Sequence, residues 1–451
     1  MTRAGILTTD PGLLNGGRNG NKLRLEDRAA HDWYRFILSF PPHLVREYIQ
    51  RFEVAAQKCV LDPFCGTGTT LVECKKQGVP SIGVEAHPMA CFASQVKVNW
   101  NADPDGLLRH AERVAVLTLE RLRADGIDDE ALPLFHLPRK RVRELLSLPP
   151  ESFDLLLKGS ISPLPLHKTL VLLQRLSQHG DERFGQYERL ALARALVFQI
   201  SNLEFGPEVG VGHPKPDSPV VAPWFNAVRA IADDLRHLRR LNETSAVVRQ
   251  ADARRLASVL EPNSVDAVIT SPPYPNEKDY TRTTRLESVL LGFITNKKEL
   301  RLVKQGLVRS NTRGVFKTDL DDQEIVHHKE IQRIARAIEA RRIQLGKTSG
   351  FERLYARVTK LYFGGMQQHL SELRTILRSG AQLAYVVGDQ ASYLQVMIRT
   401  GTLLADIACS LGYEVMGIDL FRTRLATATK EQLREEVVLL RWPGGKKIPR
   451  R

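Results

Sequence analysis

The chain has 451 residues, of which 43% are hydrophobic and 26% are charged, and its 65 Lys and Arg exceed its 51 Asp and Glu to give a net charge of +14. It contains no apolar stretch of about 18 residues, which argues against a membrane span, and its N-terminus lacks the apolar run of a secretory signal. The five cysteines form no CxxC pair and no zinc-type Cys/His cluster, so we expect a reduced, cytoplasmic protein without a bound metal.

The excess positive charge is unevenly distributed along the chain. Between Arg282 and Gly380 there are 20 Lys and Arg against 10 Asp and Glu. Basic surfaces attract polyanions, and uneven placement favours a nucleic-acid partner over a role in solubility alone.

The first hundred residues change from a polar segment to an α/β pattern. Residues 1–30 are polar and glycine-rich, which predicts a flexible arm. Pro41 and Pro42 predict a helix start. Residues 58–62 and 81–85 are short apolar runs separated by a Gly/Thr turn and a helical stretch, which predicts a βαβ unit.

The middle of the chain is mostly helical. Within residues 101–243, a set of large apolar side chains recurs at helical spacing, namely Trp224, Val228, Ile231, Leu235 and Leu238. Glycine and proline are frequent over 206–223, which predicts an irregular loop.

Strand patterns return after residue 243. We expect strands over 246–252, 265–270, 382–387, 414–419 and 436–441, the last two paired as a hairpin. Between them, residues 282–379 are basic and again mostly helical. The sequence therefore predicts one discontinuous α/β core, 31–100 with 244–295 and 380–451, interrupted by two mostly helical insertions at 101–243 and 296–379.

The first motif is Asp62-Pro63-Phe64-Cys65-Gly66-Thr67-Gly68-Thr69-Thr70, at the junction of a strand and a helix. Its glycines allow a ligand to approach the backbone, and the helix start offers free N–H groups. It lacks the Lys-Ser/Thr of a Walker loop and the third glycine of the dinucleotide fingerprint. Glu85 ends the next strand, where an acid can bind both ribose hydroxyls. This arrangement favours a binding site for S-adenosylmethionine. The alternative is a tight turn with a structural role only, next to ordinary surface acids.

The second motif is Thr270-Ser271-Pro272-Pro273-Tyr274, directly after a predicted strand. The two prolines stiffen the backbone and remove two N–H donors. What remains are carbonyls, a hydroxyl and an aromatic face, a set that suits an exocyclic amino group stacked on Tyr274. A proline turn with a packed tyrosine is the alternative.

Together the two motifs resemble those of the DNA amino-methyltransferases, which transfer a methyl group from S-adenosylmethionine to an exocyclic amine. The Ser form of the tetrad resembles the N4-cytosine branch, whereas Asp and Asn forms are typical of N6-adenine enzymes. The resemblance covers about half of the chain, over 31–100, 246–292 and 380–442. It implies a Rossmann-like methyltransferase sheet with a C-terminal antiparallel hairpin.

The resemblance also implies roles for individual residues. The tetrad Ser271, Pro272, Pro273 and Tyr274 is catalytic, acting on a base flipped out of the duplex, and Cys65 needs no catalytic role. Residues 34–46 resemble the motif that closes over the cofactor, and Asp252 matches the acid that reads its adenine amine. The expected cofactor-binding residues are Tyr34, Phe40, Asp62, Pro63, Phe64, Gly66, Gly68, Thr69, Thr70, Glu85, Asp252 and Ala253.

Candidate DNA contacts lie in both insertions. Arg309, Arg313 and Lys317 lie in or beside a polar loop suited to phosphate or guanine contacts, and Lys215 and His213 lie in the Gly/Pro loop. A solvated basic face is the alternative for each. Insertion 101–243 is a candidate target-recognition region and 296–379 a candidate DNA-binding region, and the order of the motifs leaves open which one reads the DNA.

The expected activity is site-specific methylation of the cytosine N4 amine in double-stranded DNA, either as the modification half of a restriction–modification pair with a separately encoded endonuclease or as a stand-alone epigenetic enzyme. DNA N6-adenine methylation is the closest rival. RNA guanine-N2 methylation and a non-catalytic nucleic-acid-binding role remain as further alternatives. Neither a metal nor a membrane partner is expected.

Overall fold

The computed structural model describes residues 23–35, 40–129, 144–205, 208–276, 278–425 and 432–445. Most of the predicted flexible arm, residues 1–22, lies outside this range. Its remainder differs from the prediction, because residues 23–30 hold η2 (Leu25–Asp27) and the start of α1 (Arg28–His31). Asp27 is only 3% exposed and accepts a hydrogen bond from Arg46 at 2.7 Å, which anchors this segment to the body of the protein.

A seven-stranded sheet forms the centre of the molecule, with the strand order β5-β2-β1-β6-β7-β9-β8. The first five strands in this order run parallel, and β9 runs antiparallel between β7 and β8. The predicted α/β sheet with its C-terminal antiparallel hairpin is therefore confirmed. The strands are β1 (Val60–Asp62), β2 (Ser81–Glu85), β5 (Ala246–Gln250), β6 (Val265–Thr270), β7 (Leu377–Gly388), β8 (Glu414–Leu425) and β9 (Gln432–Arg441).

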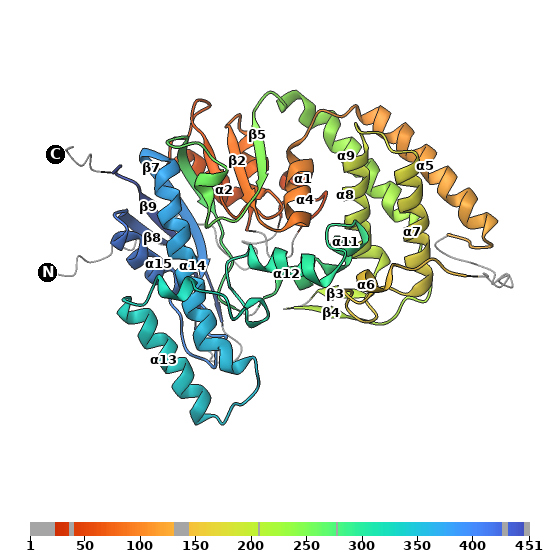
Figure 1. Ribbon diagram of the computed structural model, residues 1–451. Helices are drawn as coiled ribbons and strands as arrows, with labels where there is room; N and C mark the ends of the chain where they lie inside the picture. Colours follow the sequence, from red (N-terminus) through yellow and green to blue (C-terminus); the bar gives the residue numbers. More distant parts are fainter. Residues whose placement is uncertain are drawn as a thin grey trace.

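Helices cover both faces of this sheet (Figure 1). Along β7, Leu383 and Tyr385 point to the face covered by α14 (Tyr355–Ile376) and α15 (Thr400–Ser410). Ala384 and Val386 point to the opposite face, covered by α2 (Pro42–Arg51) and α3 (Thr69–Lys76). This alternation follows from the two-residue period of a strand, and the near-continuous apolar sequence is what a sheet buried on both faces requires.

Helix α14 corrects one predicted boundary. The second insertion was expected to extend to residue 379, yet α14 packs directly on the sheet and buries Val358, Tyr362 and Met366 in the same core as Leu383. The apolar face of α14 makes it a covering helix of the sheet.

The segment 101–243 forms a helical region beside the sheet, at the right of Figure 1. Its helix α9 buries Trp224, Val228, Ile231, Leu235 and Leu238, as their spacing predicts. Its elements, with the helix α4 that joins it to the sheet, are α4 (Pro88–Val98), α5 (Pro104–Ala124), α6 (Pro150–Phe153), α7 (Pro163–Gln178), α8 (Gly185–Ala195), η3 (Leu196–Ile200), α9 (Val221–Leu238) and η4 (Arg239–Leu241).

Part of the predicted irregular loop is ordered as a small hairpin. Strand β3 (Leu203–Phe205) pairs antiparallel with β4 (Val209–Val211), and residues 206–207 between them lie outside the described residues.

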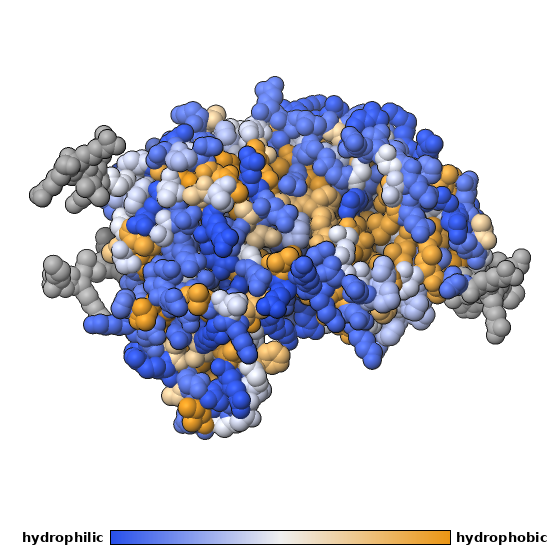
Figure 2. Space-filling view, viewed as in Figure 1, coloured by the Kyte–Doolittle hydropathy of each residue, from blue (hydrophilic) through white to orange (hydrophobic). Residues whose placement is uncertain are grey.

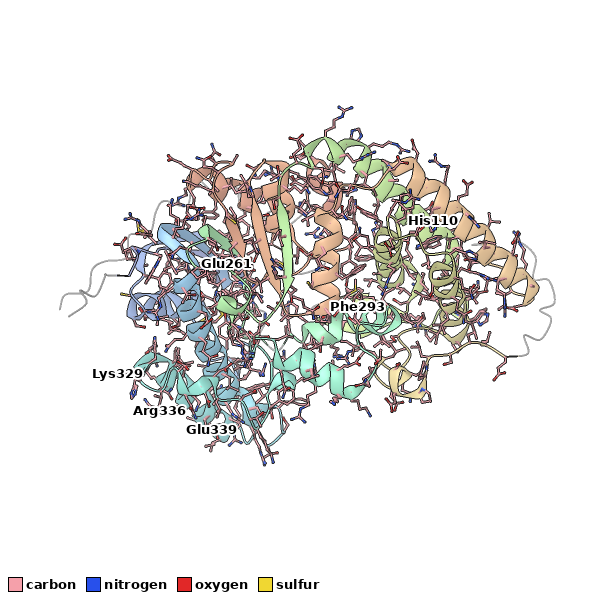
Figure 3. The ribbon with its side chains drawn as sticks, turned by 45° about the horizontal axis from the view of Figure 1, so that its top comes forward. His110, Glu261, Phe293, Lys329, Arg336 and Glu339 are labelled. Carbon is pink, nitrogen blue, oxygen red and sulfur yellow. The ribbon has the colours of Figure 1, made fainter. Side chains whose placement is uncertain are left out.

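The segment after β6 holds short helices and one projecting helix, α13 (Lys329–Gln344). Figure 3 shows Lys329, Arg336 and Glu339 following one another along α13 at the lower edge, and Figure 2 shows this edge as mostly hydrophilic. The remaining elements are η5 (Leu256–Ser258), α10 (Tyr280–Thr283), α11 (Arg285–Leu290), α12 (Lys297–Gln305), η6 (Thr312–Gly314), η7 (Asp321–Gln323), α13 (Lys329–Gln344) and η8 (Glu352–Leu354). Among the helices of the described residues, none combines the length and apolar character that crossing a membrane requires.

Two adjacent glycines let this segment approach α14 closely. A Cβ atom placed on Gly364 would lie 1.8 Å from the carbonyl oxygen of Asp321. The backbone of η7 therefore rests directly on the helix, where only a glycine leaves room.

We expect the variant Gly364→Ala to lower the free energy of unfolding by about 1–3 kcal/mol, the usual cost of overpacking. Urea denaturation measures the change. The matched control is Gly185→Ala at the start of α8, where nothing lies within 4 Å of the added Cβ. Equal stability of Gly364→Ala and the wild type would contradict the direct packing of η7 on α14.

Candidate active site

The two sequence motifs meet at one edge of the sheet. Strands β1 and β6 are parallel neighbours, and the chain continues from β1 toward β2 on one side and from β6 toward β7 on the other. Ligands of open α/β sheets bind in the crevice beyond the carboxyl ends of the strands at such a switch point. Residues 62–70 follow β1 and residues 270–274 end and follow β6, so both motifs border this crevice.

Asp62 joins the two motifs through its buried carboxylate, which is 1% exposed. It accepts hydrogen bonds from the hydroxyl of Thr70 at 2.7 Å, the hydroxyl of Thr270 at 2.6 Å and the backbone N–H of Phe64 at 3.1 Å. Burial raises the pKa of Asp62 to about 6, although these hydrogen bonds act in the opposite direction. Asp62 and Thr70 were expected to bind cofactor, but the structure places them beneath the loop, where they hold its shape.

The glycines of the first motif have distinct roles. Gly66 and Gly68 adopt left-handed conformations, with φ of 51° and 85°. A Cβ on Gly68 would lie 2.5 Å from the hydroxyl of Ser94, so Gly68 allows α3 to start close against α4. Gly68 is not among the residues that line the crevice, whereas Gly66 and Thr69 are.

The crevice contains a continuous cavity of about 400 Å³, within the size range of small-molecule sites. It brings together most of the predicted cofactor residues and the whole predicted catalytic tetrad. The predicted residues that line it are Phe40, Pro63, Phe64, Gly66, Thr69, Glu85, Asp252, Ala253, Ser271, Pro272, Pro273 and Tyr274.

Tyr34 is a correction to the predicted site. Its ring is 1% exposed within the hydrophobic core, and its hydroxyl donates to Glu287 at 2.5 Å, away from the cavity-lining residues. A tyrosine so placed secures the segment after α1 against α11. Residues 36–39 of the predicted closing motif lie outside the described residues, and Phe40 does line the cavity.

Glu85 faces the cavity from the end of β2. Its carboxylate accepts the backbone N–H of Gly66 at 2.9 Å and that of His87 at 2.7 Å. Burial raises the pKa of Glu85 to about 7, against the effect of these two bonds. Each carboxylate oxygen keeps a further acceptor site, which suits a pair of ligand hydroxyls.

Asp252 and Phe64 form a second part of the cavity wall. Asp252 accepts from the backbone N–H of Arg254 at 2.9 Å and from its guanidinium at 2.7–3.1 Å. Phe64 packs edge-on against His369, with ring centroids 4.8 Å apart. Arg254 was missed by the sequence analysis, since an arginine two residues after an acid carries no distinctive pattern.

The catalytic tetrad occupies the other end of the cavity. The Ser271 hydroxyl donates to the carbonyl of Val386 at 3.1 Å, so its oxygen remains available as an acceptor. Gly388 ends β7 beside the ring of Tyr274, because a Cβ there would lie 3.2 Å from that ring. Gly388 is a second residue that the sequence analysis missed.

The second insertion supplies a wall of this cavity, lined by residues 306–311 and Gly314. Arg309 was expected to contact DNA, yet its side chain is 4% exposed. It makes two bonds to Asp319, at 2.9 and 2.8 Å, and donates to the carbonyl of Lys304 at 2.8 Å. A guanidinium with these partners stabilises the loop and is not exposed for contact with DNA at the protein surface.

The other predicted DNA contacts divide into two groups. Lys215 donates to the carbonyls of Gln199 and Ser201 at 3.0 and 2.7 Å, so it stabilises its own loop, which corrects its prediction. Arg313, Lys317 and His213 are exposed. The sequence analysis missed four cations that line the cavity, namely Lys278, Lys304, Arg422 and Arg424. Among the described residues, no group of three or more His, Cys, Asp or Glu is placed to hold a metal ion.

Comparisons with known proteins find similarity to DNA methyltransferases. A family model described as DNA methylase, of the N6/N4 type, matches residues 18–95. The chain is 24% identical over 447 residues to the Type II methyltransferase M.BsoBI of Geobacillus stearothermophilus, covering 92% of this chain and 85% of that protein. It is 23% identical to the Type II methyltransferase M.AvaI of Nostoc sp., covering 93% and 87%. Among solved structures, the rRNA methyltransferase aviRa from Streptomyces viridochromogenes is 10% identical over 93% of this chain and 94% of that chain, with a TM-score of 0.32, too slight a likeness to bear on the fold.

These matches relate the chain to the DNA amino-methyltransferase family. Members of this family use S-adenosylmethionine as the methyl donor, and the residues present fit it. Gly66, Glu85, Asp252 and Phe64 all line the cavity. Glu85 would hold the ribose hydroxyls of this cofactor, and Asp252 would accept from its adenine amine beside the ring of Phe64.

We expect cofactor affinity to depend on the ionisation of Glu85. Because burial raises its pKa to about 7, the carboxylate gains a proton as the pH falls through 7 and loses acceptor capacity for the ribose. The Kd for S-adenosylmethionine should rise by up to about tenfold for each pH unit below 7, as measured by calorimetry between pH 8 and pH 6.

The variant Glu85→Gln should bind more weakly at pH 8 and show a much flatter pH dependence. Glu261→Gln, at an exposed site away from the cavity-lining residues, is the matched control and should retain the wild-type profile. A wild-type affinity that stays constant over this range would refute the assignment of Glu85 to the ribose.

Proposed function

We propose that this protein is a Type II DNA methyltransferase that methylates the exocyclic N4 amine of cytosine at a specific site in double-stranded DNA, as part of a restriction–modification system. The observation that carries the proposal is the opening of the Ser271–Tyr274 tetrad into the same cavity as Glu85 and Asp252. The relatives M.BsoBI and M.AvaI, both Type II methyltransferases by name, support the same class.

The tetrad acts on the amine by accepting its hydrogens. Ser271 has committed its own proton to Val386, so its oxygen accepts one amine hydrogen. The carbonyl of Pro272 accepts the other, and Pro272 and Pro273 bring no N–H that would repel the amine. Two acceptors placed in this way draw the nitrogen toward a tetrahedral shape and localise its lone pair, which in a free cytosine is delocalised into the ring.

The bound cofactor supplies an electrophilic methyl group on a sulfonium. The protein would hold nucleophile and electrophile in one cavity, and alignment of this kind accounts for a large part of such a rate enhancement. Cys65 takes no part, because it is 5% exposed and burial raises the pKa of its thiol well above the ordinary value.

A base inside duplex DNA cannot reach this cavity, so the target nucleotide must rotate out of the stack. Aromatic side chains line the cavity to receive it. Tyr274 lies within the tetrad, Phe421 comes from β8 and Phe40 precedes α2. Stacking on such rings replaces the stacking that the base loses on leaving the duplex.

The neutral hydroxyl of Ser271 favours cytosine N4 over adenine N6, because the tetrads typical of N6-adenine enzymes begin with Asp or Asn. The cations that line the cavity are compatible with cytosine, whose N3 next to the amine and O2 beyond it both accept hydrogen bonds. Lys278 follows the tetrad, and Arg422 and Arg424 come from β8.

The product identifies the target base. We expect plasmid DNA methylated by the purified protein to yield N4-methylcytosine when it is digested to nucleosides and analysed by mass spectrometry. N6-methyladenine in its place would overturn the cytosine assignment while retaining the class of reaction. Methyl label on RNA and none on DNA would overturn the proposed substrate.

The matched variants for this experiment are Tyr274→Ala and Pro272→Ala. Each should lower kcat by at least about 100-fold, since a small misplacement of the reacting groups has an effect of this order, and each should leave the Kd for S-adenosylmethionine within about threefold. Full activity in Tyr274→Ala would contradict the catalytic assignment.

The cations at the cavity should differ in what they contribute to DNA binding. Arg424 is 44% exposed, and we expect Arg424→Gln to weaken DNA binding and reduce the slope of log Kd against log salt by about 1. Fluorescence anisotropy with a labelled duplex at several salt concentrations measures this slope.

The contrasting variant is Arg309→Gln. It leaves Asp319 buried without its partner, and we expect a loss of about 3–5 kcal/mol in the free energy of unfolding, with little change of the salt slope in the folded fraction. If Arg309→Gln reduced the slope of log Kd against log salt and left the free energy of unfolding unchanged, Arg309 would be a DNA contact after all.

A further inference from the structure

Arg254 lies between two carboxylates that come from different parts of the chain. Its Nε and Nη2 atoms bind Asp252 at 3.0 and 2.7 Å, and its Nη1 atom binds Asp321 at 2.6 Å. The side chains of all three are largely buried, at 10%, 17% and 14% exposed for Arg254, Asp252 and Asp321. Burial alone would lower the pKa of Arg254, but the hydrogen bonds and charges of the two carboxylates outweigh it and raise the pKa above the ordinary value.

The stem of Arg254 is held as firmly as its guanidinium. A Cβ placed on Gly365 of α14 would lie 3.6 Å from the Cδ atom of Arg254 and 3.4 Å from Val308. The same guanidinium donates to the carbonyl of Gln305, the last residue of α12, at 2.8 Å. Arg254 therefore contacts both ends of the segment between Gln305 and Asp321, whose residues 306–311 line the cavity.

This arrangement fixes the direction of the Asp252 carboxylate. The guanidinium fork and the backbone N–H of Arg254 occupy three of the roughly four acceptor sites of the carboxylate. Since Asp252 lines the cavity, the acceptor site that remains serves a donor inside it. The adenine amine is a donor of this kind.

We propose that Arg254 is a positioning residue for cofactor recognition, which aims the Asp252 carboxylate at the adenine amine and ties it, through Gln305 and Asp321, to the cavity wall at 306–311. The inference rests on the assignment of Asp252 to the adenine end of the cofactor. Arg254 lies outside both sequence motifs. In this proposal it controls whether the site prefers a hydrogen-bond donor or an acceptor at the purine position that carries the amine in adenine.

A positioning role and a purely structural role differ in one measurable respect. If Arg254 acts through Asp252, its loss weakens binding of an amine-bearing purine and leaves binding of a carbonyl-bearing purine nearly unchanged. If it only stabilises the fold or the cavity, both purines lose affinity together. S-adenosylhomocysteine and S-inosylhomocysteine provide this pair, since the first carries an amine at position 6 with an unprotonated N1 and the second a carbonyl at position 6 with a hydrogen on N1, and they are otherwise identical.

The experiment measures the Kd of both compounds by calorimetry on the full chain without DNA. The variants are Arg254→Gln and Arg254→Lys, and the matched control is Arg255→Gln, which alters the exposed neighbouring arginine. We expect the wild type and the control to prefer the adenosyl compound by tenfold or more, because an unpaired acceptor remains with the inosyl compound. In Arg254→Gln we expect this preference to fall below about threefold, with Arg254→Lys intermediate.

Asp321→Asn is a milder variant, because it removes one charge from the partners of Arg254 and keeps the arginine. It tests the proposal even if Arg254→Gln does not fold. It should reduce the preference in the same direction. It should also speed amide hydrogen exchange over residues 306–311 in the ligand-free protein, a readout that is independent of activity.

A preference unchanged in Arg254→Gln and Asp321→Asn, or a parallel loss for both compounds, would overturn the positioning role while leaving the proposed methyltransferase function intact. Failure of the wild type to bind either compound would instead overturn the cofactor assignment, and the inference with it.

Discussion

The carboxylate of Asp62 is the interaction on which the rest of the site depends. It binds groups from the turn after β1, from α3 and from the end of β6, and its partner Thr270 lies 208 residues further along the chain. A buried carboxylate with three donors is stabilised only if all three stay in place. The cofactor loop and the catalytic tetrad are thereby held in one fixed relation, and neither can shift without leaving a polar group unpaired in the core.

The cavity is assembled from parts of the chain that have little else in common. Strand ends supply Glu85 and the tetrad, the segment between α12 and η7 supplies one wall, and β8 supplies Phe421 with two cations. The helical region at 101–243 shares one hydrophobic core with α3, α4 and α11, and Asp234 of α9 joins it to the N-terminal segment by accepting bonds from Ala30 and Trp33 at 3.0 and 2.7 Å. Rigid elements thus carry the chemistry, and connecting segments shape access to it.

What the sequence predicted well is what local pattern controls. The strands, the apolar face of α9 and the C-terminal hairpin follow from residue periodicity, and the two motifs follow from their position at strand ends. Periodicity does not report which polar group meets which across the fold. Tyr34 looked available for a ligand yet bonds to Glu287, 253 residues away, and Arg309 and Lys215 looked free yet hold their own loops. For the same reason the sequence pattern did not predict a role for Arg254 or Gly388, whose roles depend on contacts with residues distant in sequence.

The pairing of β1 with β6 has a consequence for how such proteins can evolve. The two halves of the site meet through parallel neighbouring strands and one shared carboxylate, and neither of these depends on which half comes first along the chain. Rearrangement of the gene that exchanged the halves would preserve every contact around Asp62 as long as the new joins fell outside the sheet. The fold therefore constrains adjacency in space and leaves the linear order of its motifs free to drift.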